Sequence, residues 1–288
     1  MTTNELAVWL RSLGEDRYPE DGLQEGDPDA VVRGVLCCWW SSRAAREAAR
    51  AMGANVIVAH EAAYFDVPQQ DPGCPEPDTW PVNEQAREFY RTTGTAFIRA
   101  HRCLDAWGVG EAFADYLGFP PPAVREGYRG YHFTLVYDLP PSTFAQLTER
   151  LKRRMKRAVV RTSLADPGRV VCRVGLGWGG IPLSSNLAYV EPLRRHGAEV
   201  IVGGEVDEFT MEYCREAGLE WIELGHYASE IVGVRRLARD LAARLPGVPV
   251  RCHEEQEDRV RFCCIPPSAD NVQDREDNPL LRASHSVR

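Results

Sequence analysis

Short, wholly apolar segments that alternate with helix-length segments constrain the fold of this chain more than any other feature. Residues 55–59 (NVIVA) and 199–202 (EVIV) contain almost no polar residues, a pattern typical of strands that are buried on both faces of a parallel sheet. Amphipathic segments at 43–53, 186–196, 208–217 and 228–245 lie between or after such strands. Because parallel strands need crossover connections, this β-α-β rhythm predicts an α/β fold.

The middle of the chain has a different hydrophobic pattern. Residues 131–137 (YHFTLVY) alternate like a half-exposed strand, and a helix candidate at 142–156 follows. We therefore expect two related α/β lobes with mixed sheets, residues 1–125 and 165–265, that form one metal-binding unit around a central α+β insert at 126–164. From residue 266 to 288 the sequence is polar without an apolar period, which predicts a flexible tail or an arm that docks on a partner subunit.

Composition excludes several classes of protein. The 288 residues contain no apolar run long enough for a membrane span and begin without a secretory signal, so we expect a soluble cytoplasmic protein with no membrane partner. The net charge of −8 argues against nucleic acid as a partner, since such binding needs a basic field. Nine cysteines occur without a C-x-x-C motif, which favours reduced, buried thiols over a structural zinc site.

Metal-type ligands follow two of the apolar segments. His60 and Glu61 come directly after the strand NVIVA, and ligands in open parallel sheets bind outside the carboxyl ends of strands. In HRCLDAW, Asp105 offers a hard carboxylate oxygen and His101 lies four positions earlier. Each feature alone also fits a plainer interpretation, as a polar loop for the first and a helix cap for the second.

A third group of ligands opens the long helix candidate near the end of the chain. In GHYASE, His226 and Glu230 lie four positions apart, so on a helix they share one face and can converge on one ion. A glutamate can also bridge two metals through its two oxygens. The alternative is a helix N-terminus with a capping histidine and a surface glutamate.

A glycine motif offers a competing ligand. Gly175, Gly177 and Gly180 spell G-x-G-x-x-G after a strand, and Glu205 lies near the position of a ribose-binding acid. The motif is in the middle of the chain and not in its first β-α-β unit. A close strand-to-helix turn that lines a metal pocket explains the glycines equally well.

The segments occur in an order that resembles the dinuclear-metal-centre proteins named GTP cyclohydrolase I type 2 homologs, the Nif-three-like family. The resemblance extends to about residue 251 and includes EDGLQEGDP, ANVIVAHE, RAHRCLDA, GLGWGG, AEVIVGGEV and GHYASE. It implies that His60 and Asp105 hold one metal, that Glu61 and His226 hold the other, and that Glu230 bridges them. It also implies a ring-like homohexamer of two α/β lobes with a central insert.

The chain departs from this family at two positions. The family usually has His-His where this chain has His60-Glu61, and a glutamate adds negative charge and a harder donor. That change shifts the preference from zinc toward iron, manganese or magnesium, so we expect two divalent ions drawn from iron, manganese or zinc. The family also tends to have a histidine shortly after the G-[DE]-V turn, where this chain has Phe209.

We expect from these features a dinuclear metal-dependent hydrolase, similar to cyclohydrolases or amidohydrolases, that acts on a small heterocyclic or amide substrate. His101 is the first candidate for moving a proton and Glu61 the second, while Trp178, Glu205 and Tyr227 are expected to line the pocket. A metal-binding regulatory protein or metallochaperone without turnover is the alternative, and a closed coordination shell would favour it. An iron-dependent oxidative enzyme is the further alternative, because the mixture of histidine and carboxylate also suits iron.

Overall fold

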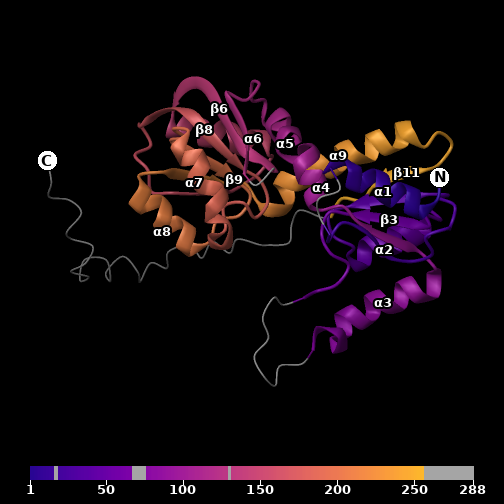
Figure 1. Ribbon diagram of the computed structural model, residues 1–288. Helices are drawn as coiled ribbons and strands as arrows, with labels where there is room; N and C mark the ends of the chain where they lie inside the picture. The colour runs from indigo at the N-terminus through magenta and orange to yellow at the C-terminus, as the bar shows by residue number, and fades with distance from the viewer. Residues whose placement is uncertain (16–18, 67–75, 129–130, 256–288) are drawn as a thin grey trace, which may run out of the picture. The chain divides into compact units, whose positions relative to one another are not determined.

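The computed structural model describes residues 1–15, 19–66, 76–128 and 131–255, in which strands form two mixed sheets (Figure 1). The expected α/β class is confirmed. The first sheet has five strands in the order β1-β4-β3-β2-β11, and only β1 runs antiparallel to its neighbour. The elements within residues 3–117 are α1 (Thr3–Leu13), β1 (Gly22–Glu25), β2 (Val35–Cys38), α2 (Arg43–Ala51), β3 (Val56–Ala59), the 3₁₀ turn η1 (Pro77–Thr79), α3 (Pro81–Thr93), β4 (Ala96–Arg99), α4 (Arg102–Leu104), the π-helical turn η2 (Asp105–Val109) and α5 (Gly110–Leu117).

The second sheet has six strands in the order β5-β6-β8-β9-β10-β7. Its inner strands β8, β9 and β10 are parallel, and antiparallel strands flank them on both sides. The elements within residues 124–252 are β5 (Val124–Tyr128), β6 (Tyr131–Thr143), α6 (Phe144–Arg154), β7 (Arg161–Thr162), β8 (Val170–Gly177), the 3₁₀ turn η3 (Ser184–Asn186), α7 (Leu187–Arg195), β9 (Val200–Gly203), α8 (Glu208–Ala217), β10 (Glu220–Glu223), α9 (His226–Arg244) and β11 (Val250–Cys252), of which β11 belongs to the first sheet.

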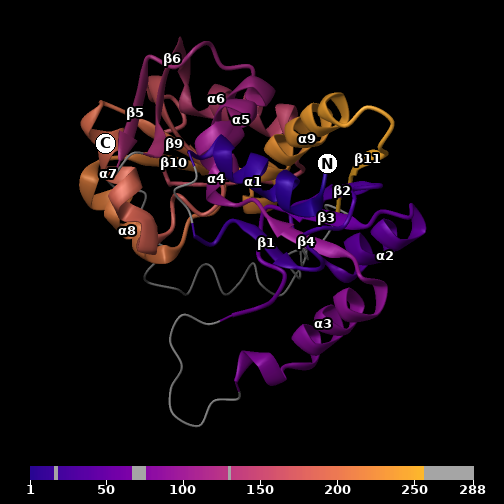
Figure 2. The ribbon, with the colours of Figure 1, turned by 45° about the vertical axis from the view of Figure 1, so that its right-hand side comes forward.

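Both sheets are buried on both faces, as their apolar sequences require. In β2, alternate residues enter two different cores: Val35 and Cys37 face α1 and α9, and Leu36 and Cys38 face α2. In the second sheet, α7 and α8 cover one face with a separate cluster (Figure 2). The largest core continues from the inner face of one sheet to the inner face of the other.

Helix α9 connects the two sheets. It begins directly after β10 in the second sheet, and its later turns pack on the first sheet, where Leu237 and Leu241 are buried. The chain then enters β11, which pairs in parallel with β2 of the first sheet. A close approach fixes the middle of the helix, because a Cβ atom on Gly233 would lie 2.7 Å from Cγ2 and 3.1 Å from Cα of Val109.

The segment expected as a central insert contributes strands to the second sheet. Most of β5, together with β6 and β7, falls within residues 126–164 or at its edge, and these strands pair with one another, with β8 and with β10. The division into two related lobes and an insert stays a prediction. The polar tail at 266–288 lies outside the described residues. Among the described residues, no helix combines the length and apolar character that crossing a lipid bilayer requires.

Gly233→Ala tests the close contact between α9 and η2. The added methyl group must displace Val109, so we expect the free energy of unfolding to fall by about 1–2 kcal/mol, although alanine is the better helix former. Urea unfolding measures the change. The exposed substitution Ala243→Ser on the same helix should stay within about 0.5 kcal/mol of the wild type. An unchanged midpoint for Gly233→Ala would contradict the contact.

Candidate metal centre

The carboxyl ends of strands from both sheets supply one cluster of polar side chains. His60 and Glu61 follow β3, and Asp105 opens η2 after β4. From the second sheet, His226 and Glu230 lie in the first turns of α9, directly after β10. The structure thus brings together all five side chains that the sequence predicts as ligands, as expected for residues at the carboxyl ends of parallel strands.

The carboxylate of Glu230 lies between two histidines. Its Oε2 atom is 3.5 Å from Nδ1 of His60 and 3.3 Å from Nε2 of His226. Glu61 lies on the same side, since its Oε1 is 3.8 Å from each of these two nitrogens. The indole N–H of Trp39 donates to Glu230 Oε2 over 2.6 Å. This hydrogen bond holds a carboxylate that is only 3% exposed.

A second group of ligand atoms surrounds the other nitrogen of His60. Nε2 of this fully buried histidine is 3.3 Å from Oδ1 of Asp105, and the same oxygen accepts a 2.8 Å hydrogen bond from the indole N–H of Trp178. The ring of His101 meets that of His60 edge-on at 4.8 Å between centroids. His60, His101 and Asp105 form one set of three atoms close enough to hold an ion, and His60, Glu61 and Glu230 form another.

Electrostatics tie these groups together. Burial opposes the charged form of His60, yet the negative charges of Glu230 and Asp105 raise its pKa well above the usual value. Burial likewise opposes ionisation of Glu61, but its contact with His60 lowers the pKa of that carboxyl group to about 2. His226 is half-buried, and although desolvation opposes its charged form, Glu230 and Glu205 raise its pKa to about 9. In contrast, burial and the nearby His60 lower the pKa of His101.

The glycine-rich turn after β8 leaves space for this cluster. Gly179 has φ +54°, and a Cβ atom there would lie 1.7 Å from Oε1 of Glu230. A Cβ on Gly180 would approach Cε1 of His226 to 3.3 Å, and one on Gly177 would touch Pro182. The helix α7 begins only at Leu187. Close packing around the cluster therefore accounts for these glycines, and the turn does not open directly into a helix as a dinucleotide site requires.

Glu205 and Tyr227, two of the residues expected to line the pocket, are not part of the wall of the cavity that opens onto the cluster. Oε2 of Glu205 lies 3.0 Å from Nδ1 of His226, a contact that directs the opposite ring nitrogen toward Glu230 and Glu61. Tyr227 instead packs edge-on against the ring of Trp39, with 5.5 Å between centroids. Phe209, which stands where the family tends to have a histidine, lies at the start of α8 with 78% of its surface exposed to solvent.

The segment from 101 to 105 is anchored by a residue that the sequence did not single out. Both oxygens of the buried Asp21 accept backbone hydrogen bonds, from His101 over 2.6 Å and from Cys103 over 2.7 Å. Burial raises the pKa of Asp21, against the effect of these two donors. Asp21 and Trp39 were both missed because their partners lie far away in the chain; the motif EDGLQEGDP, which includes Asp21, was the one available signal.

A cavity of about 270 Å³ opens onto the cluster. Glu61, His101, Asp105, His226 and Glu230 form its polar side, and Trp178 is part of its wall. Its volume is slightly below the range of about 300–1,000 Å³ that is usual for small-molecule sites. The cavity therefore suits a small substrate.

The donor set fits divalent cations. Carboxylate oxygens and imidazole nitrogens are the ligands preferred by iron, manganese and zinc. Moreover, Nδ1 of His60 is buried without a hydrogen-bond partner, although it faces the carboxylates of Glu61 and Glu230. Buried polar atoms are rarely left unpaired, and a cation held between this nitrogen and the two carboxylates would satisfy it.

Comparisons with known proteins place the whole described domain in one group. Residues 5–259 match the family described as Duf34/NIF3 (NGG1p interacting factor 3). A GTP cyclohydrolase 1 type 2 homolog from Allochromatium vinosum is 27% identical over 237 residues, which cover 79% of this chain and 84% of that protein. The counterpart with the same name from Yersinia pestis is 28% identical over 78% of this chain and 85% of its own length.

Solved structures share the fold. The Staphylococcus aureus hypothetical protein SA1388 superposes with a TM-score of 0.72 and 17% identity, over 91% of this chain and 99% of that chain. HcgD from Methanocaldococcus jannaschii, in its reduced form, superposes with a TM-score of 0.68 and 18% identity, over 88% of this chain and 98% of that chain. The predicted resemblance is thereby confirmed at the level of family and fold.

Asp21→Ala tests the anchor of the 101–105 segment. It would leave two backbone N–H groups without their acceptor, and we expect the free energy of unfolding to fall by about 2–3 kcal/mol. Chemical denaturation measures the change. Asp29→Ala removes an exposed carboxylate from the same part of the chain and should change stability by less than about 0.5 kcal/mol. Equal effects of the two substitutions would show that Asp21 does not hold this segment.

Proposed function

The chain belongs to the DUF34/NIF3 family, and from this premise we propose that it is a dinuclear metal-dependent hydrolase acting on a small amide or heterocycle. The observation that supports the proposal most strongly is the position of Glu230 Oε2 between a ring nitrogen of His60 and one of His226. A carboxylate placed in this way is suited to bridge two cations. The names of the curated relatives, homologs of a GTP cyclohydrolase, are consistent with opening of a ring.

The two ligand sets divide around His60 and Glu230. We assign His60 and Asp105 to one cation, Glu61 and His226 to the other, and Glu230 to both. Because Asp105 faces Nε2 of His60 and Glu230 faces Nδ1, this assignment requires the imidazole ring of His60 to turn when a cation binds. When bound, two divalent cations would polarise a carbonyl group and lower the pKa of water toward neutrality. The N–H groups of Trp39 and Trp178 hold the Glu230 and Asp105 carboxylates in place during this chemistry.

His101 is the residue we assign to proton transfer. It lines the cavity beside the ligand cluster. Nη2 of Arg99 lies 3.1 Å from its Nδ1, so an arginine N–H donor occupies that nitrogen and leaves Nε2 to carry the proton of the neutral ring. To move a proton, the ring must first take one from the attacking water at Nδ1, in place of the Arg99 contact. The imidazolium formed in this way can then give its Nε2 proton to the leaving group of a cleaved amide bond and return to the neutral ring.

Metal content tests the ligand assignment. We expect about two equivalents of divalent metal in protein purified without a metal-affinity tag, and less than one in Glu230→Gln, since the amide removes the negative charge shared by both sites. Elemental analysis by mass spectrometry measures both. Glu47→Gln alters an exposed carboxylate on α2 and should keep the wild-type content. Absence of metal from the wild type, even after reconstitution, would exclude the dinuclear centre.

Turnover tests the role of His101 separately from metal binding. With metal-loaded protein, dihydrouracil as a cyclic amide and p-nitroacetanilide as a linear one are the first substrates to assay. For whichever is hydrolysed, we expect His101→Gln to lower kcat about 10²-fold or more while the metal content stays unchanged. Full metal content without turnover on any small amide or heterocycle would favour the metallochaperone or regulatory function. Assembly into a homohexamer and a cytoplasmic location stay predictions.

A further inference from the structure

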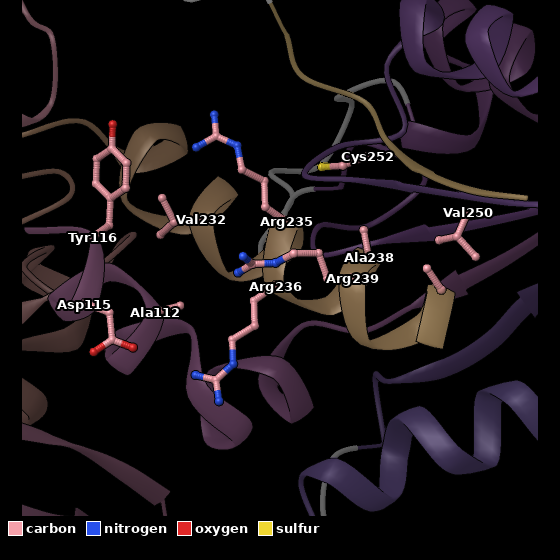
Figure 3. A pocket seen from close by; sticks show the side chains of 11 residues that line it. Ala112, Asp115, Tyr116, Val232, Arg235, Arg236, Ala238, Arg239, Val250 and Cys252 are labelled. Carbon is pink, nitrogen blue, oxygen red and sulfur yellow. The ribbon is translucent and has the colours of Figure 1, made fainter. Parts of the chain in front are cut away.

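A second, larger cavity lies away from the metal centre, between α5, α9 and β11 (Figure 3). Its volume is about 650 Å³, which lies within the usual range for binding a small organic molecule. Arg235, Arg236 and Arg239 project into it from α9, and Asp115 and Tyr116 of α5 lie on its other side. We name this cavity, defined by these five residues together with its apolar wall, the arginine pocket.

The arginine pocket and the metal centre use different faces of α9. Arg239 follows Glu230 by nine residues in an unbroken helix, which corresponds to two and a half turns at about 3.6 residues per turn. The side chains of Arg239 and Glu230 therefore leave the helix in opposite directions. The arginine pocket is thus separate from the proposed hydrolytic site, and nothing in its chemistry depends on metals.

The wall of the pocket is apolar and made of small side chains. Ala112 of α5, Val232 and Ala238 of α9, and Val250 of β11 line it. Because these side chains are short, they leave space that larger residues would fill. A ligand that enters the pocket must therefore place an apolar body against this wall.

The charges of the pocket are not balanced. Arg235 is paired with Glu254, at 2.6 Å between Nη2 and Oε2. Arg236 instead lies over the ring of Trp107, with 4.8 Å from Cζ to the ring centroid. Within the part of the chain that the structure describes, neither Arg236 nor Arg239 forms an ion pair with a carboxylate.

Asp115 limits what the pocket can accept. With Arg235 neutralised by Glu254, the two remaining arginines face one aspartate, so the lining has a net charge of +1 (2 − 1) in a chain whose net charge is −8. A single negative group restores neutrality, whereas a ligand with several negative charges would be repelled by Asp115. The guanidinium group is suited to this role because its N–H donors match the two oxygens of a carboxylate, sulfonate or phosphate ester.

We propose that the arginine pocket binds a small organic monoanion, with its negative group on Arg236 and Arg239 and its apolar or aromatic body against Ala112, Val232 and Val250. The ring of Trp107 holds the guanidinium of Arg236 in place before the ligand arrives, and such preorganisation lowers the entropic cost of binding. Tyr116 offers an aromatic ring to the body of the ligand.

The probe for this proposal is 8-anilinonaphthalene-1-sulfonate, a fluorescent monoanion with an aromatic body. Its affinity is measured by fluorescence titration of the full-length protein as purified, and the variants below leave all the proposed metal ligands in place. We expect the variant with both Arg236→Gln and Arg239→Gln to bind it about tenfold more weakly or worse, as loss of charge-assisted hydrogen bonds requires. N-phenyl-1-naphthylamine, which has the same rings without the sulfonate, should bind wild type and variant alike.

Two further variants locate the probe. Arg251→Gln removes the same charge from an exposed residue of β11 that does not line the pocket, and it should bind the anionic probe like the wild type. Ala242 of α9 also lines the pocket, so Ala242→Trp fills it without changing its charge and should abolish binding. The proposal is overturned if the double arginine variant binds the sulfonate as tightly as the wild type, if Arg251→Gln weakens binding equally, or if Ala242→Trp still binds.

Discussion

The structure depends most on the burial of charged side chains where the two sheets meet. His60 is completely buried, Glu230 is 3% exposed, and Asp105 is 9% exposed. Removing such groups from water is costly unless each finds a partner of opposite charge or a hydrogen-bond donor. The fold supplies both: histidines face carboxylates, and the indole groups of Trp39 and Trp178 donate to the carboxylates. Because these partners come from both sheets, neither sheet can complete the cluster alone.

Helix α9 meets this requirement through its position. Its first turns carry His226 and Glu230 at the end of the second sheet, and its later turns are buried against the first. A shift along its axis would separate Glu230 from His60. The contact of Gly233 with Val109 and the space that Gly179 leaves for Glu230 both restrict such a shift. These two glycines therefore allow the neighbouring segments to approach closely enough to keep Glu230 in the cluster. The G-x-G-x-x-G pattern at 175–180, taken from the sequence alone, is also compatible with nucleotide binding.

Local patterns predicted much of the fold and the ligand positions. Wholly apolar strands indicated buried parallel sheets. Ligand residues that directly follow a strand, or that lie four positions apart on the helix after a strand, could be placed at the carboxyl edge of a sheet. The supporting residues could not be found in this way. Trp39 and Glu230 are 191 positions apart, and Asp21 acts on a backbone N–H 80 positions later. No periodicity links such pairs. The α9 segment was also expected to begin near residue 228, whereas the helix begins at His226 because Gly225, at φ +103°, ends the preceding turn.

Glu61 changes the charge of the proposed centre more than its shape. With Glu61, Asp105 and Glu230 ionised, the ligands would contribute three negative charges against the four positive charges of two divalent cations. A histidine at position 61 would leave only two negative charges. The lower net charge weakens the pull of the cations on a carbonyl group, and the added oxygen donor favours iron or manganese over zinc. Oε1 of Glu61 lies 3.8 Å from Nδ1 of His60 and from Nε2 of His226, whereas Asp105 faces the opposite nitrogen of His60. This difference therefore acts mainly on the cation assigned to Glu61 and His226. The two halves of the proposed centre are therefore unequal, and the side of His60 and Asp105 is the one that we expect to match the rest of the family.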